Sequence, residues 1–206
     1  MQRYWAGTLN EIDKLLAKKK YYVFLAIEIA ICILMLILDK LFARASDGFI
    51  TFGAADLSLM MLTFFIHVYI PLIIFMASCD AFSSEYNDGT VKAILIRPVT
   101  RLKVYLSKIT SVMLLALGYL AALFLTTVTL ELLFGEGLRS FWVSVGAYIL
   151  DIVPLFVLLL MAVLMNQLAK SSSLTMFLLI LVYVLLTVLG IFIPQLSGLL
   201  FTGYAQ

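Results

Sequence analysis

Charged side chains are scarce in this sequence: Asp, Glu, Lys and Arg together make up 13% of its 206 residues. Soluble domains carry about 25% of these residues and roughly 45–50% apolar ones, whereas 64% of this chain is hydrophobic. A globule of 23.0 kDa has too little interior to hide so much apolar surface from water. The composition therefore excludes an ordinary soluble protein and indicates an integral membrane protein, in agreement with a mean hydropathy of +1.13.

Several other residue types are too few to support common function classes. The formal net charge of +2 is too small to indicate a nucleic-acid partner. The two cysteines, Cys32 and Cys79, have neither metal-ligand nor disulfide-framework spacing, so we expect them to fill apolar space. With one histidine, the chain cannot contain the His-Glu-x-x-His pattern of membrane metalloproteases. It also lacks Gly-x-x-x-x-Gly-Lys-Ser/Thr, so it has no Walker A phosphate cradle.

Five nearly uncharged runs are long enough to cross a bilayer, which requires about 20 mostly apolar residues per helix. They cover residues 21–38, 57–79, 109–130, 141–165 and 174–193. The first run is longer than the apolar part of a signal peptide and has no small-residue cleavage site after it, so we interpret it as a span. The sequence predicts an all-α integral membrane protein with one transmembrane domain over residues 1–206.

Lys and Arg are distributed unevenly between the two sides of these spans. Eleven lie on the side of the N-terminus: five before the first span, five within residues 80–108, and Lys170. Three lie on the opposite side, namely Lys40, Arg44 and Arg139. Because cytoplasmic loops carry the excess of positive charge, the N-terminus is predicted to be cytoplasmic. Five spans then place residue 206 on the outer side.

A separate amphipathic helix is predicted over residues 8–19, before the first span. Thr8 and Glu11 have the spacing of a capping box, which marks a helix start. We expect this helix to lie flat in the cytoplasmic interface of the membrane. Four aromatic residues are expected to anchor it at headgroup level: Tyr4, Trp5, Tyr21 and Tyr22. A frayed N-terminal tail is the alternative.

Residues 80–108 form a longer and more specialised loop than the others. Gly89 can adopt the positive φ that ends a helix, and Thr90 can cap a new one over residues 91–96. Pro98 then ends that short helix. The pattern predicts a short helix across the cytoplasmic base, suited to being held by another protein. An amphipathic connector that covers the floor of the bundle is the alternative.

The order of these features resembles that of type-2 ABC transporter permeases. The cytoplasmic signature of that family is similar to Glu85-x-x-x-Gly89-Thr90, a short apolar helix, Arg97-Pro98-x-x-Arg101 and Lys108. Residues 10–20 resemble its connecting helix, and residues 166–173 resemble its second cytoplasmic turn. The family norm is six spans, whereas five are predicted here. Residues 194–198 resemble the start of the external stretch that precedes the sixth.

The resemblance implies a membrane-spanning permease subunit of an ATP-driven exporter for an amphipathic or hydrophobic cargo, such as an antimicrobial peptide, an antibiotic or a lipid-linked compound. It implies that the chain is no enzyme and binds no cofactor itself. ATP and magnesium would belong to a cytoplasmic ABC ATPase partner, present in two copies. A second permease chain, identical or paralogous, would complete the path through the cell membrane.

The same resemblance assigns ATPase coupling to one group of residues. The group comprises Glu85, Gly89, Thr90, Val91, Ile94, Leu95, Arg97, Pro98, Arg101 and Lys170. Glu85 is expected at the joint that transmits motion, where its carboxylate accepts bonds from the next helix or pairs with an arginine. A solvated surface charge is the alternative for Glu85. Arg97 and Arg101 have the alternative of neutralising anionic lipid headgroups.

Three polar residues inside the predicted spans need an explanation, because unpaired charge is costly in lipid. Glu28 is a candidate for the translocation path, with a satisfied internal hydrogen bond as the alternative. Asp151, with Pro154, is the second candidate and marks a predicted kink with a small cavity. His67 lies four residues before Pro71, so its ring is predicted to bond the carbonyl that the proline leaves unpaired. No metal site is expected.

Three rival interpretations remain. A non-pumping scaffold or immunity protein that binds a toxic peptide or lipid is the main alternative function. A membrane enzyme is disfavoured, since Lys92 and Arg97 have four residues between them where the lipid phosphatase motif has six. A secondary transporter is disfavoured because no internal repeat is visible.

Overall fold

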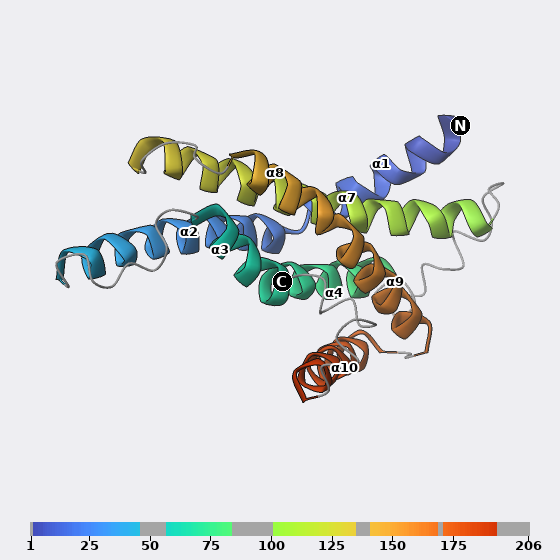
Figure 1. The fold of residues 1–206 in the computed structure, drawn as a ribbon. Coiled ribbons are helices and arrows are strands. Elements are labelled where there is room, and N and C mark those ends of the chain that lie inside the picture. The colour runs from blue at the N-terminus through green and yellow to red at the C-terminus, as the bar shows by residue number, and fades with distance from the viewer. Residues whose placement is uncertain (1, 46–56, 84–100, 135–140, 169–170, 193–206) are drawn as a thin grey trace.

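A computed structural model describes residues 2–45, 57–83, 101–134, 141–168 and 171–192 of the chain. This described part is helical and holds no strand. Its elements, labelled in Figure 1, are α1 (Gln2–Leu16), α2 (Lys19–Ala45), α3 (Leu57–Phe64), the π-helical turn η2 (Phe65–Tyr69), α4 (Ile70–Ala81), α7 (Arg101–Phe134), α8 (Phe141–Leu150), α9 (Ile152–Leu168) and α10 (Ser172–Phe192).

Five helical stretches are long and apolar enough to cross a membrane, as the sequence predicts. They are Lys19–Phe42, Leu59–Ala81, Leu102–Leu133, Phe141–Leu168 and Ser172–Leu189. The third is longer than its uncharged run of 109–130, because the polar residues before Ile109 continue the same helix. A helix that extends beyond the apolar run reaches past the hydrocarbon core, which is about 30 Å thick.

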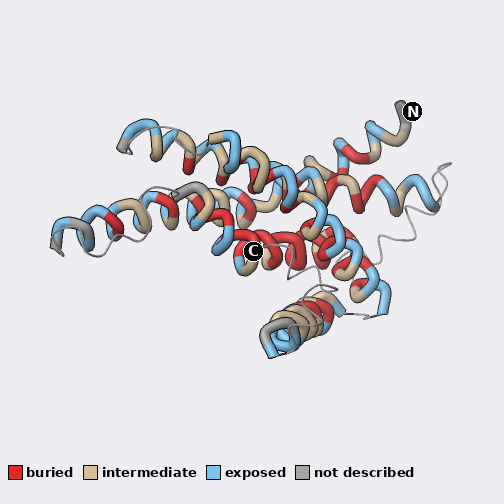
Figure 2. The backbone as a smooth tube through the Cα atoms, viewed as in Figure 1, coloured by how far each residue is buried: buried red, intermediate tan, exposed pale blue. Residues whose placement is uncertain are grey.

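The centre of the bundle is α4. Ten of its residues are buried, among them Ile70, Ile73, Ile74 and Phe75, and Figure 2 shows almost every turn of this helix in the buried class. It packs against α7, α9 and α10. A helix that is apolar on all sides is typical of such a central position.

The N-terminal helix α1 packs against the first part of α7, near Thr110. It begins at Gln2, so Thr8 lies within the helix and the predicted capping box at Thr8 and Glu11 is wrong. The Thr8 hydroxyl instead donates to the Tyr4 carbonyl, at 3.2 Å, and lies 3.4 Å from the Thr110 hydroxyl of α7. A short polar side chain inside a helix commonly bonds back in this way. Gly7 faces Ser107 of α7: a Cβ there would lie 3.6 Å from the Ser107 hydroxyl oxygen, an ordinary van der Waals contact.

The second span changes its winding at η2, just before Pro71. Because proline has no N–H, it leaves the carbonyl four residues earlier, that of His67, without its usual helical donor. The Tyr183 hydroxyl of α10 donates to this carbonyl at 2.8 Å. The prediction that the His67 ring would do so is wrong: ring Nδ1 lies 2.8 Å from the Thr63 carbonyl oxygen instead.

The fourth span is interrupted once, at Asp151, where α8 passes into α9 (Figure 1). The backbone bonds around the interruption persist: the Asp151 N–H donates to the Ala147 carbonyl at 3.0 Å, and the Leu155 N–H donates to the Asp151 carbonyl at 3.3 Å. Pro154 cannot donate to the carbonyl of Leu150, which explains a local irregularity at this point.

Candidate functional site

Most of the residues assigned to ATPase coupling lie outside the described residues. They are Glu85, Gly89, Thr90, Val91, Ile94, Leu95, Arg97, Pro98 and Lys170, and the predicted short helix 91–96 lies there with them. Arg101 is the first residue of α7, and its side chain is not described. Residues 194–198 are also outside. The structure does describe the residues directly before and after the 84–100 segment.

Asp80 lies at the end of α4 and joins it to the start of α2. Its carboxylate is 2.5 Å from the Lys20 ammonium and 3.0 Å from that of Lys18, and it accepts a hydrogen bond of 2.7 Å from the Tyr21 hydroxyl. The lysine side chains keep about two fifths of their surface exposed, whereas that of Asp80 is 12% exposed. Three donors around one carboxylate form a charge-assisted joint between the two helices.

The next residue, Ala81, is connected to α7 and through it to α1. Its carbonyl accepts a 2.5 Å hydrogen bond from the Lys108 ammonium, which also lies 3.8 Å from a Glu11 carboxylate oxygen. The second Glu11 oxygen pairs with Lys14 at 2.6 Å. The Lys108 ammonium lies 5.6 Å from the centre of the Phe82 ring. Lys108 is buried, so its charge is compensated locally.

Ser83 connects the same segment to the last two spans. Its hydroxyl donates to the Asn166 side-chain oxygen of α9 at 2.7 Å and lies 3.4 Å from the Thr175 hydroxyl of α10. All three residues are buried. Close by, the Phe82 ring packs edge-on against Tyr105 of α7, whose hydroxyl accepts a hydrogen bond from Gln167 of α9.

We call the four consecutive residues Asp80, Ala81, Phe82 and Ser83 the 80–83 junction. They form direct contacts with α2, α7, α9 and α10, and Lys108 extends the set to α1. Buried polar networks of this kind fix the relative positions of the elements that they join. The 80–83 junction and Lys108 thus connect α4 to five other helices of the bundle.

The sequence did not single out this junction. Asp80 served only as the boundary of the second span, and Lys18 and Lys20 only as positive charge in a cytoplasmic segment. Tyr21 was predicted to anchor at headgroup level, but it is 2% exposed and bonded to Asp80. Trp5 and Tyr22 do expose more than half of their surface, as anchors would. The sequence does contain a signal for this contact. An acidic residue, Asp80, ends the second span, and the lysines Lys18 and Lys20 precede the first span, so opposite charges stand at the ends of two helices.

Glu28 is fully buried at 0% exposure, and neither of its carboxylate oxygens has a hydrogen-bond partner within the part of the chain that the structure describes. The alternative interpretation of Glu28 was a satisfied internal hydrogen bond. The described residues form no such bond with it. Cys32, Tyr69 and Tyr119 lie within electrostatic range of its carboxyl.

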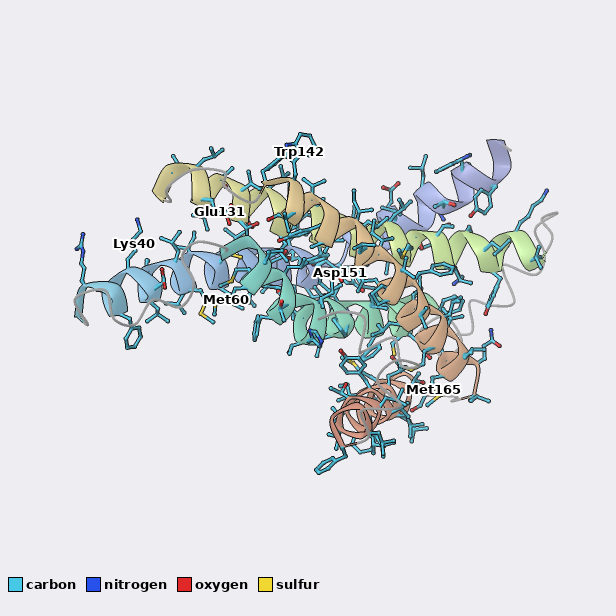
Figure 3. All side chains as sticks on the ribbon, in the orientation of Figure 1. Lys40, Met60, Glu131, Trp142, Asp151 and Met165 are labelled. Atoms are coloured by element: carbon cyan, nitrogen blue, oxygen red, sulfur yellow. The ribbon has the colours of Figure 1, made fainter. Side chains whose placement is uncertain are left out.

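Asp151 is 8% exposed and lies within electrostatic range of His67. Figure 3 shows it on the fourth span, where α8 passes into α9. His67 and Tyr69 belong to the same π-helical turn, and residues two apart in a helix point to nearly opposite sides. The structure thus places Glu28 and Asp151 beside different residues of η2.

A cavity of about 260 Å³ lies between α7 and α8, next to Asp151 in the sequence. It is lined by Leu117, Leu120, Ala121, Phe124, Val145, Tyr148, Ile149 and Ile152. These side chains suit an alkyl chain or an aromatic ring. Across the described ranges, no group of three or more His, Cys, Asp or Glu side chains gathers in a metal-binding arrangement.

A family model described as "ABC-2 family transporter protein" matches residues 9–192 of the chain. The match covers most of α1, all five candidate spans and the segment between the 80–83 junction and α7. No curated protein was found to match the chain.

Proposed function

Because the chain belongs to the ABC-2 transporter family, we propose that it is the permease subunit of an ATP-driven exporter. Membership establishes the coarser statement, that the chain is a multi-pass membrane permease component of an ABC transporter. The proposed cargo is amphipathic or hydrophobic: an antimicrobial peptide, an antibiotic or a lipid-linked compound. The apolar cavity between α7 and α8 supports a cargo of this chemistry.

ATP and magnesium are proposed to bind on a partner rather than on this chain. The ABC-2 membrane domain is a permease and not an ATPase, and the family generally works with a cytoplasmic ABC ATPase. We assign the contact with two copies of that ATPase to residues 85–101 and to Lys170. Closure of the two copies on ATP would then displace these residues.

The 80–83 junction is the observation that best supports this function. The proposed ATPase contact begins two residues after Ser83, and the junction is bonded to α2, α7, α9 and α10. Lys108, at the other end of the same loop, joins Ala81 to Glu11 of α1. Force received by the loop is therefore delivered to both of its ends and to the helices around them.

A second permease chain, identical or paralogous, is part of the proposal. Five spans form too thin a bundle to enclose a large solute. The exposed faces of α2 and α10 carry large apolar side chains, such as Ile27, Leu34, Phe177 and Leu185, which are suitable for contact with another chain or with lipid. We place the assembly in the cell membrane with the N-terminus cytoplasmic and residue 206 outside, from the distribution of Lys and Arg.

The alternative function, a scaffold or immunity protein that binds a toxic peptide or lipid without pumping, has the same fold but no ATPase partner. Purification of the full chain in mild detergent separates the two, because a permease retains an ATPase and a scaffold does not. Absence of an ATPase from a stable, folded preparation would contradict the exporter.

Glu85→Ala tests the coupling role within that complex. Reconstituted in vesicles with its ATPase, the variant should hydrolyse ATP but should fail to export a fluorescently labelled amphipathic peptide. Asp13→Ala, which changes an exposed carboxylate on α1, is the matched control. Normal export by Glu85→Ala would refute the assigned role of Glu85. It would not contradict the exporter itself, which the purification tests separately.

A further inference from the structure

The first span has an inverted pattern of burial. Between Val23 and Leu38 its exposed side chains are apolar, whereas each buried residue on α2, within the side chains that the structure describes, carries a titratable group. These buried residues are Tyr21, Glu28, Cys32 and Asp39. We call them the α2 inner row. Core positions are normally apolar, so packing alone does not explain this choice of residues.

The α2 inner row is straight and long. Its spacings of seven, four and seven residues place all four side chains within an arc of about 40° on a helix with 3.6 residues per turn. From Tyr21 to Asp39 the helix rises by about 27 Å, close to the thickness of the hydrocarbon core of roughly 30 Å. The row therefore follows the whole apolar part of the span.

Glu28 lies near the middle of this row, about 14 Å along the helix from Lys19. The two tyrosine hydroxyls within electrostatic range of it are already engaged: Tyr69 donates to the Phe24 carbonyl, and Tyr119 donates to the Tyr21 carbonyl at 2.5 Å. Both carboxylate oxygens are consequently left without a hydrogen-bond donor among the described residues.

An ionised carboxylate in this position would be strongly unfavourable. No described Lys, Arg or His side chain forms an ion pair with Glu28, and burial of an unpaired charge costs several kcal/mol. A single bound proton removes the charge. One carboxylate without further free oxygen ligands gives a metal cation a poorer site, because such cations require several oxygen atoms.

We propose that Glu28 is a proton-binding site in the middle of the membrane and that it exchanges its proton toward the Asp80 end of α2. The relay would consist of Tyr119, Tyr21 and Asp80. The Tyr21 hydroxyl donates to Asp80 at 2.7 Å, the Tyr119 hydroxyl donates to the Tyr21 backbone carbonyl at 2.5 Å, and Tyr119 lies within electrostatic range of Glu28. The proposal concerns the chain itself and goes beyond the proposed export function, since it holds for any cargo.

The groups around Glu28 come from three elements. On α2 there is Cys32, on η2 there is Tyr69, and on α7 there is Tyr119. None of these is a fixed cation. Deprotonation of Glu28 would therefore favour rotation of a tyrosine hydroxyl from its backbone carbonyl toward the carboxylate. Such a rotation would loosen α2 from α7 or from η2, which links proton binding to the position of the first span.

Infrared spectroscopy of the full chain in lipid nanodiscs at neutral pH tests whether the proton is bound. The C=O stretching band of a protonated carboxyl should be present in the wild type and lost in Glu28→Gln, which replaces the acid by an isosteric neutral group. The matched control is Glu131→Gln, at the outer end of α7, which should keep the band. Identical bands in the wild type and in Glu28→Gln would overturn the proposal.

A hydrophobic carbodiimide provides a second measurement that needs no variant. A protonated carboxyl adds across a C=N bond of the reagent: its oxygen bonds to the central carbon and its proton moves to a nitrogen. The acyl group then migrates to the other nitrogen and leaves a stable N-acylurea. Peptide mapping should find this adduct at Glu28. No adduct at Glu28, or suppression of the adduct by sodium or potassium chloride at constant pH, would overturn the proposal, the latter in favour of a bound cation.

The relay is tested by the rate at which the carboxyl band shifts after transfer into D2O. Tyr119→Phe should slow this exchange about tenfold, because one hydrogen-bonding station is lost from the path. Tyr183→Phe, which removes a hydroxyl bonded to the His67 carbonyl instead, should leave the rate unchanged. Equal rates in the wild type and in Tyr119→Phe would refute the relay through Tyr119.

Discussion

The first and last spans, α2 and α10, are the two most exposed helices of the bundle, yet they are attached by different chemistry. Of their most apolar windows, 17% and 11% are buried, compared with 61% in the span that contains α4. The buried positions of α2 are the four titratable residues of the inner row, whereas those described on α10 are Thr175 and Leu179. Hydroxyl bonds attach α10, through Tyr183 to the His67 carbonyl and through Thr175 beside Ser83.

This difference indicates which perturbations each helix will resist. The start of α2 is attached by charge, because Asp80 meets two lysines and a tyrosine there. The Tyr69 and Tyr119 hydroxyls add neutral bonds to backbone carbonyls of α2. The attachment of α10 depends on neutral groups, so changes in pH or salt should affect it little. We therefore expect a change of charge near Asp80 to displace α2 and to leave α10 in place.

Removal of the Asp80 carboxylate should have the largest effect on stability, and it should act on the attachment of α2. In Asp80→Ala the Lys20 ammonium and the Tyr21 hydroxyl lose their shared acceptor. We expect a loss of about 2 kcal/mol in stability, less than for a fully buried pair, because the lysines remain partly in water. Thermal unfolding in detergent measures it, with Asp13→Ala as the control. Equal melting temperatures for the two variants would contradict the proposed role of the 80–83 junction in holding α2.

Tyr183→Phe should have the next largest effect, and on α10 rather than α2. The substitution leaves the His67 carbonyl, which Pro71 cannot supply with a donor, unpaired within the membrane. We expect a loss of about 1 kcal/mol, together with faster amide hydrogen exchange in α10 and unchanged exchange in α2. Tyr22→Phe, at an exposed position of α2, is the control. Equal loss of protection in both helices would argue against separate attachments.

The smallest effect is expected at the contact between α1 and α7. Thr110→Val removes the hydroxyl that accepts a 3.1 Å hydrogen bond from Tyr4 and lies beside Thr8. We expect a loss of about 0.5 kcal/mol and faster amide exchange in α1 only. Thr129→Val changes a threonine of the same helix whose hydroxyl donates to the Thr126 carbonyl, so it serves as the control. Unchanged exchange in α1 would mean that apolar packing alone holds this helix.

The number and order of the spans could be predicted from the sequence, because a run of about 20 apolar residues has no stable place outside lipid. The helix ends were less predictable. Polar residues such as Lys103 and Lys108 lie before the apolar run but inside the helix, since their backbones still form the helical hydrogen bonds. Thr8 shows the same problem at α1, where a residue suited to start a helix lies inside one.

The contacts of the candidate site were not predictable in the same way. Tyr21 and Asp80 are 59 positions apart, and their meeting depends on the rotation and tilt of two helices that the apolar pattern leaves open. Glu28 could be singled out because a carboxyl within an apolar run is costly. Its role in the translocation path stays a prediction, as do the roles of Asp151 and of the coupling residues from Glu85 to Lys170.

The π-helical turn at Phe65–Tyr69 gives the second span one residue more than a regular helix of the same length would hold. Deletion of a single residue there would remove the extra residue and restore regular winding, while α3 and α4 would keep their present faces toward α7. The same deletion in a regular stretch of the span would turn one part of the helix against the other by about 100°. The π-helical turn is therefore a place where the span can lose a residue without moving Asp80 away from Lys20.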